Sequence, residues 1–141
     1  MRDMMNCTNP KRGISPVKQT NADTAFVSQI LDTQGLAAAT FVLLIGAVTD
    51  TDVTFVVLAE EGDASNLSDN TAIADANLLG TELLATPLLT DDNKCFKLGF
   101  IDTKRFIRVT VTPTGNNSGD INIAGLWNTH PLIMPAANPP T

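Results

Sequence analysis

The sequence is poor in the residues that most often build catalytic and binding sites. Its 141 residues include no tyrosine, one tryptophan, one histidine and two cysteines. A lone histidine such as His130 is far more often a surface or packing residue than a catalytic base. Cys7, Cys95 and His130 also lack the spacing of zinc ligands. We therefore predict that the chain is not an enzyme, with no catalytic residue, no metal and no cofactor.

Familiar catalytic motifs are missing as well. The chain contains no G-x-S-x-G nucleophile elbow, no H-E-x-x-H zinc motif and no glycine-rich phosphate loop. Asp50 and Asp52 look like paired carboxylates, but they lie in a Thr-Asp-Thr-Asp run, where aspartate favours turn geometry. A second group of acids, Glu60, Glu61, Asp63 and Asp69, could attract a calcium ion, but it lacks the spacing of an EF-hand calcium loop. We favour a turn for the first group and a solvated acidic loop for the second.

Basic residues are absent from a long internal stretch. Between residues 19 and 93 there is no lysine or arginine, whereas the same stretch has twelve acids. The net charge of −6 argues against binding of nucleic acid or an anionic membrane by the whole molecule. Lys104, Arg105 and Arg108 flank Phe106 as a nucleic-acid stacking platform would. We expect instead that these cations contact the acidic stretch, residues 19–93, of a neighbouring subunit.

No apolar segment is long enough for a transmembrane helix. The longest, residues 36–48, has thirteen residues, whereas about 20 are needed to cross a bilayer. Residues 1–7 lack the apolar run of a secretory signal. We therefore expect no membrane partner and maturation in a cytoplasm. There Cys7 and Cys95 stay reduced, although a disulfide between them is the alternative.

Period-two alternation of apolar and polar residues indicates strands in much of the chain. Inward-facing sets are expected at Val53, Phe55 and Val57 and again at residues 107, 109 and 111. The unbroken apolar run Phe41–Ile45 predicts burial on both faces of its strand. Residues 38–60 and 95–112 are predicted to form hairpins, and residues 26–31 and 121–127 further strands. We predict an all-β fold, an antiparallel β-sandwich or barrel of about six to eight strands.

The two ends and one internal segment depart from this pattern. Residues 1–22, which contain Pro10, Gly13 and Pro16, are predicted to be an extended N-terminal arm. Residues 23–133 form the β domain, and residues 134–141 a proline-rich tail. In residues 61–93, either Ser68 or Asp69 caps a short helix through residue 77, or the segment is a strand-bearing excursion. In the second case the leucine pairs 83–84 and 88–89 pack down as anchors, and Pro87 excludes a central strand.

Three segments carry a family resemblance. They are residues 72–82 (AIADANLLGTE), residues 91–94 (DDNK) and residues 97–113, which include the run KRFIRVTVTP. With them the chain, from about residue 14 to 133, resembles the capsid decoration proteins of tailed phages and prophages, also called cement or head-stabilising proteins. The resemblance implies a virion protein on the capsid exterior, assembled in the host bacterial cytoplasm. It further implies a homotrimer that binds an HK97-like major capsid protein, and it transfers no catalytic residues.

The basic residues and the arm supply the candidate contacts. An extended arm can become ordered on a capsid lattice and add a strand to a capsid-protein sheet. Trp127 is either a core residue or an interface anchor. The candidates for capsid or inter-subunit contact are Arg2, Lys11, Arg12, Ile14, Val17, Lys18, Lys104, Arg105, Arg108 and Trp127.

Two other functions remain open on the sequence. The first is a tail-tube or head–tail joining protein, which would form rings. The second is a carbohydrate-binding or receptor-binding β-sandwich. The shortage of aromatic residues, with no tyrosine and a single tryptophan, counts against the second.

Overall fold

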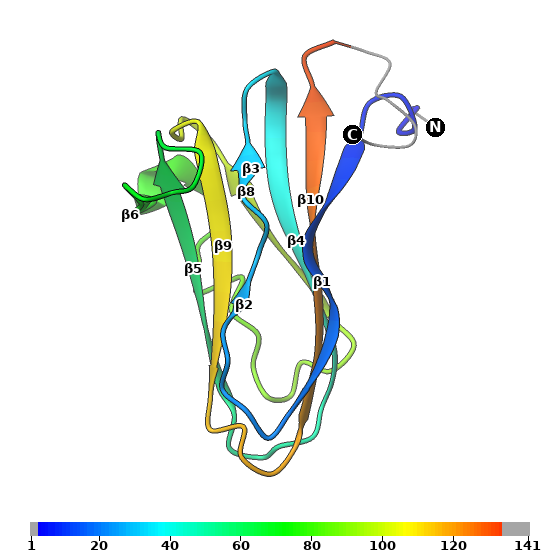
Figure 1. Ribbon diagram of the computed structural model, residues 1–141. Coiled ribbons are helices and arrows are strands. Elements are labelled where there is room, and N and C mark those ends of the chain that lie inside the picture. The colour runs from blue at the N-terminus through cyan, green and yellow to red at the C-terminus, as the bar shows by residue number, and fades with distance from the viewer. Residues whose placement is uncertain (1–2, 134–141) are drawn as a thin grey trace.

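The computed structural model describes residues 3–133 and shows two antiparallel β-sheets packed face to face (Figure 1). One sheet, which we call sheet A, contains β1 (Asn9–Thr20), β4 (Leu36–Val48), β7 (Leu78–Leu79), β8 (Cys95–Phe100) and β10 (Asp120–Pro131). The other, sheet B, contains β2 (Phe26–Val27), β3 (Leu31–Asp32), β5 (Thr54–Gly62), β6 (Thr71–Ala72) and β9 (Phe106–Thr114). The strand order is β1-β10-β4-β8-β7 in sheet A and β2-β9-β5-β6 in sheet B, where β3 also pairs with β9. The predicted all-β fold is confirmed, in its sandwich form.

The chain crosses between the sheets wherever one long strand follows another directly. β4 lies in sheet A and pairs with β8 and β10, whereas β5 lies in sheet B and pairs with β9. In the same way β8 belongs to sheet A and β9 to sheet B. The predicted hairpins over residues 38–60 and 95–112 are therefore wrong. Alternation specifies which face of a strand is buried, but two strands with apolar faces can pair side by side or pack face to face.

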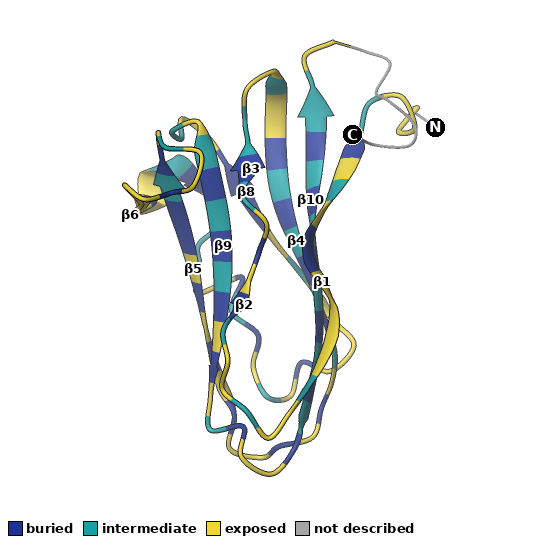
Figure 2. Cartoon of the chain, viewed as in Figure 1, coloured by how far each residue is buried: buried dark blue, intermediate teal, exposed yellow. Residues whose placement is uncertain are grey.

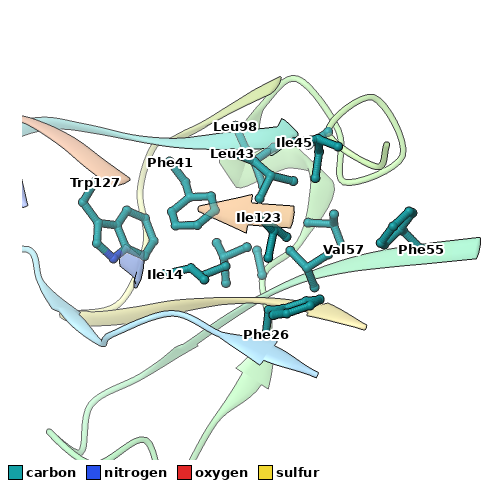
Figure 3. Packing of buried hydrophobic residues seen from close by; sticks show 14 of the residues in the cluster. Ile14, Phe26, Phe41, Leu43, Ile45, Phe55, Val57, Leu98, Ile123 and Trp127 are labelled. Carbon is teal, nitrogen blue, oxygen red and sulfur yellow. The ribbon is translucent and has the colours of Figure 1, made fainter. Parts of the chain in front are cut away.

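The core lies between the sheets and follows the predicted alternation. Figure 2 shows buried and less buried residues alternating along β4, β9 and β10. Ile107, Val109 and Val111 have no exposed surface, and Trp127 is only 1% exposed. The Phe41 and Trp127 rings meet edge to face, with their centroids 4.8 Å apart (Figure 3). This packing at the centre of sheet A joins β4 to β10.

The run Phe41–Ile45 is buried on one face only. Phe41, Leu43 and Ile45 point into the core, whereas Val42 and Leu44 are half-buried on the opposite face of sheet A. The predicted burial on both faces is corrected, because no further layer covers this side of the sheet among the described residues. Two aliphatic side chains are thus left in contact with solvent at the middle of β4.

The segment predicted as an N-terminal arm is extended, but much of it belongs to the sandwich. β1 pairs with β10 from the Asn9–Thr129 pair to the Thr20–Asp120 pair, with irregularities between residues 12 and 17. Pro10 and Pro16 are tolerated because β1 is an edge strand, where the N–H groups on the outer side have no neighbouring strand to bond. The structure therefore moves the start of the β domain from residue 23 to residue 9.

A close approach explains the glycine in β1. A Cβ at Gly13 would lie 2.6 Å from the Phe41 ring and 3.0 Å from the Gly125 carbonyl oxygen. Only a residue without a side chain lets β1 come this near to the core. Pro10, Gly13 and Pro16, from which we predicted an extended arm, are instead part of an irregular edge strand.

Residues 61–93 contain no α-helix and almost no strand. The only helical turn is a 3₁₀ helix, η1 (Asp75–Asn77), and Asp69 accepts hydrogen bonds from the Asp63 and Ala64 amides rather than capping a helix. The predicted helix through residue 77 is therefore reduced to this one turn. Within residues 3–133, no helix is long and apolar enough to cross a membrane.

The second half of this segment runs along the edge of β5. The Glu82 carboxylate accepts a hydrogen bond from the Ala59 amide, and the Thr86 hydroxyl accepts one from the Val57 amide. These side chains replace a missing neighbouring strand and protect an edge that could otherwise pair with another chain. The fully buried Pro87 lies outside any strand, as predicted.

The leucines of this segment mostly do not act as anchors. Leu83, Leu84 and Leu88 are 81%, 72% and 66% exposed, and only Leu89 packs against the core. Ala85 is the buried anchor in their place. The predicted packing of residues 83, 84 and 88 is therefore wrong. The proline-rich tail at residues 134–141 lies outside the described residues.

Candidate contact surface

The basic residues near β9 pair with acids of the same chain. The Arg108 Nη2 atom lies 2.7 Å from the Glu60 Oε2 atom, and Glu60 is itself buried. The Arg105 guanidinium makes two hydrogen bonds to Asp32, of 3.0 and 2.7 Å. These bonds lower the pKa of Asp32 and raise that of Arg105. The acidic middle of this chain thus supplies partners that we expected from a neighbouring subunit.

Lys104 makes the weakest of these pairs. Its Nζ atom lies 3.8 Å from the Asp63 carboxylate, and its amide donates a hydrogen bond to Glu61. The Arg105 guanidinium also lies over the Phe106 ring, 4.9 Å from the centroid. A ring covered in this way is not open for stacking with a base. Contact of residues 104, 105 and 108 with a capsid stays a prediction.

Two of the candidate contact residues belong to the core. Ile14 is 5% exposed, and Trp127 donates a hydrogen bond from Nε1 to the Gln29 carbonyl oxygen at 3.0 Å. A side chain that is enclosed in this way cannot reach a partner. Trp127 is therefore a core residue rather than an interface anchor, and Ile14 is no longer a candidate contact residue. Arg2 lies outside the described residues. Val17 is exposed, and Lys18 pairs with Asp120 at 2.9 Å.

The remaining surface feature is the outer face of sheet A, the side turned away from the core. The strand register places Arg12, Leu126, Val42 and Lys97 next to one another, on β1, β10, β4 and β8. Two aliphatic side chains thus lie between two cations in a row across the sheet. Lys11, by contrast, is aligned with the inward-facing Trp127 and so lies on the other side of β1.

A shallow groove lies beside this row, where β1 departs from regular pairing. One part has a volume of about 440 Å³ and the next about 300 Å³, and Pro16, Leu44 and Ala124 line both parts. The groove is open to solvent along β1. Its walls are mostly aliphatic, with Arg12 at one end and Lys18 at the other.

Acidic residues are almost absent from this face. Among the five strands of sheet A, Asp120 is the one acid, and it pairs with Lys18. Within residues 3–133, no ion pair and no side-chain hydrogen bond engages Arg12 or Lys97, and both are exposed. Exposed Cys95 lies on the same face, opposite Leu44 in the register, and it is not disulfide-bonded to Cys7.

The sequence identified only part of this surface. Arg12 and Lys18 were candidates, whereas Val42, Lys97 and Leu126 were not. Each of the three alternates with core residues on its own strand. That alternation predicts an outward position, but the row forms only once the strand order is known.

The aromatic side chains do not form an exposed platform. Phe26, Phe41, Phe55, Phe100 and Trp127 are buried, and Phe96 and Phe106 are half-buried. These seven are all the aromatic residues of the chain. Within residues 3–133, no three of the histidine, cysteine, aspartate and glutamate side chains gather in a way that could hold a metal ion.

Asp50 holds together the loops at one end of the sandwich. Its carboxylate accepts hydrogen bonds from the Asp52, Asn117 and Ser118 amides, at 2.9, 3.0 and 2.7 Å. The predicted turn role is therefore confirmed for Asp50. The Asp52 and Ser118 amides are the largest causes that lower its pKa, since they stabilise the ionised form.

The lowered pKa of Asp50 predicts acid sensitivity. Asp91 beside Lys94 and Asp120 beside Lys18 also have lowered pKa values. A lowered folded-state pKa contributes stability that is complete above the unfolded value of about 3.9 and is lost as pH falls through the folded value. We expect the melting temperature to fall steeply below about pH 4. Asp50→Asn should lower it at neutral pH and make the fall shallower, and an unchanged acid dependence would contradict this role.

Comparisons with known proteins show only distant likenesses. No protein-family model and no curated protein sequence matches the chain. A family two carbohydrate esterase from Cellvibrio japonicus shares 14% identity over 92% of this chain and 36% of its own, with a TM-score of 0.43. The xylan-binding module CBM15 shares 15% identity over 92% of this chain and 94% of its own, with a TM-score of 0.41. A chain of the capsid of Ralstonia phage GP4 shares 12% identity over 88% of this chain and 82% of its own, with a TM-score of 0.43.

These matches differ in how much of each protein they cover. The chain spans 26% of a Clostridium thermocellum xylanase chain and 36% of the esterase chain. At this level of similarity we transfer no residue role and no binding partner. The fold and its surface define an all-β sandwich protein, with one sheet face that no other layer covers within residues 3–133.

Proposed function

We propose that the protein is a structural virion protein that binds the outer surface of a phage capsid and stabilises it. The observation that carries this proposal is how its side chains are distributed. The aromatic rings are buried or half-buried, whereas aliphatic side chains gather on the outer face of sheet A, where Leu79 is exposed and Val42, Leu44 and Leu126 are half-buried. Aliphatic side chains that gather on one solvent-facing surface are typical of surfaces that contact other proteins. The resemblance of residues 97–113 to decoration proteins suggests a capsid as the partner.

A carbohydrate-binding function is less well supported by the same observation. A sugar ring is commonly held against an exposed aromatic face, because its C–H groups pack on the ring. Here the single tryptophan is enclosed by Phe41 and Phe100. The half-buried Phe106 is covered by Arg105. None of the seven aromatic side chains of the chain is exposed as such a platform would be.

The folded surface, rather than a free arm, would then make the capsid contacts. Residues 9–20 are already paired with β10, so they cannot add as a strand to a capsid-protein sheet without leaving this one. We propose a homotrimer on the capsid exterior, bound to the major capsid protein. Many weak and identical contacts across the lattice would add up through multivalency.

The test is co-sedimentation of the purified protein with capsids that lack it. We expect saturable binding to capsids and no binding on a glycan array. Binding to glycans without binding to capsids would replace this function with the carbohydrate-binding one. Rings of six or more copies in mass photometry would favour a tail-tube or head–tail joining protein.

A further inference from the structure

We propose that the outer face of sheet A is the docking face, and that its occupant is an acidic, aliphatic patch on the major capsid protein. This proposal rests on the proposed function and adds the surface and the chemistry of contact. The row Arg12, Leu126, Val42, Lys97 forms its centre, and the groove along β1 continues it.

The first argument is that some cations of the chain have an acidic partner and others do not. Arg108, Arg105 and Lys104 pair with Glu60, Asp32 and Asp63 on the side of sheet B. Arg12 and Lys97 have no such partner within residues 3–133, although the chain carries six more negative than positive charges. An acidic protein that leaves two cations unpaired on one face has a surface complementary to an acidic partner.

The second argument is the apolar surface between the two cations. Adjacent strands lie about 4.8 Å apart, so β1 and β8 are about 14 Å apart across β10 and β4. Leu126 and Val42 fill that interval, and Leu44 and Ala124 extend it toward the groove. A partner that places carboxylates on either side of an aliphatic ridge would satisfy both cations and cover the apolar row.

The third argument concerns the kind of partner. Phosphate groups of nucleic acid also pair with arginine and lysine, but an aliphatic row gives them nothing to contact. A protein surface is the occupant that uses the cations and the aliphatic residues together.

A charge-neutralised variant tests the face. Arg12→Gln with Lys97→Gln removes two positive charges and keeps long side chains. Thr54→Glu with Thr112→Glu is the matched control, because it changes the net charge equally on the exposed outer face of sheet B. We expect at least about tenfold weaker capsid binding for the first variant. Equal weakening of both variants would overturn the proposal, since net charge alone would then explain it.

Exposed Cys95 offers a direct footprint of the same face. In a Cys7→Ser background, we expect maleimide to modify Cys95 at least about tenfold more slowly when the protein is bound to capsids. The control carries Cys7→Ser, Cys95→Ser and Thr112→Cys, and its modification rate should not change on binding.

The outcomes separate this proposal from the proposed function. Wild-type protein that does not bind capsids overturns both. Capsid-bound protein whose Cys95 stays reactive overturns the docking face only. Protection of Cys95 that rises with protein concentration in the absence of capsids would identify a second copy as the occupant, and would overturn the capsid protein as the partner of this face.

Discussion

Replacing Trp127 with alanine is expected to cost about 3–5 kcal/mol of folding free energy. The indole is 1% exposed and packs against the Phe41 and Phe100 rings, with centroids 4.8 and 5.5 Å away. Its N–H group also donates a hydrogen bond to the Gln29 carbonyl oxygen. Since domains of this size have a total stability of about 5–15 kcal/mol, the variant should be close to unfolding.

Chemical denaturation followed by circular dichroism measures this loss. Trp127→Phe keeps most of the ring packing and loses the hydrogen bond, so we expect a smaller cost of about 1–2 kcal/mol. Val56→Ala, at an exposed position on sheet B, should stay within about 0.5 kcal/mol of the wild type. A midpoint for Trp127→Ala equal to that of Val56→Ala would show that the two sheets do not pack around this residue.

Gly119→Ala is expected to have the next largest effect, a loss of about 3 kcal/mol. A Cβ at this position would lie 2.3 Å from the Asp50 amide nitrogen and 2.7 Å from its Cα atom. The Asp50 backbone cannot easily move away, because the Asp50 carboxylate is bonded to the Asn117 and Ser118 amides. The Gly119 carbonyl oxygen also accepts a hydrogen bond from the Asn21 amide, which holds this loop to a third one.

Gly35→Ala is the matched control for this substitution. Gly35 has a φ of +79°, and no atom lies within 4 Å of an added Cβ. Its replacement should therefore cost only the backbone strain, about 1 kcal/mol. Thermal unfolding of the two variants measures the difference. Equal losses would mean that the loop around Asp50 yields to the new methyl group.

The burial pattern was predictable from the sequence because it depends on one strand at a time. Val57 and Val109 were assigned to the core by alternation, and both are buried. Pairing was not predictable in this way. The turn near Asp50 and the connection after Phe100 look like hairpin turns, yet both lead to the opposite sheet. Nothing local in a strand distinguishes a partner beside it from one across the core.

The candidate site was only partly predictable for the same reason. Arg12 was singled out by its charge, but its neighbours on the outer face come from residues 42, 97 and 126. The prolines of β1 suggested an arm, because the sequence does not reveal that this segment is an edge strand, where proline is tolerated. Trp127 remained open between core and interface until its neighbours Phe41 and Phe100 were known.

The central claim is that this sandwich binds the outside of a capsid, and cryo-electron microscopy of the virion that contains the protein tests it most directly. We predict density for the sandwich on the outer surface of the shell, repeated over the lattice, with the outer face of sheet A against the capsid protein. Density within the tail or at the head–tail joint, or a shell without the protein, would contradict this account.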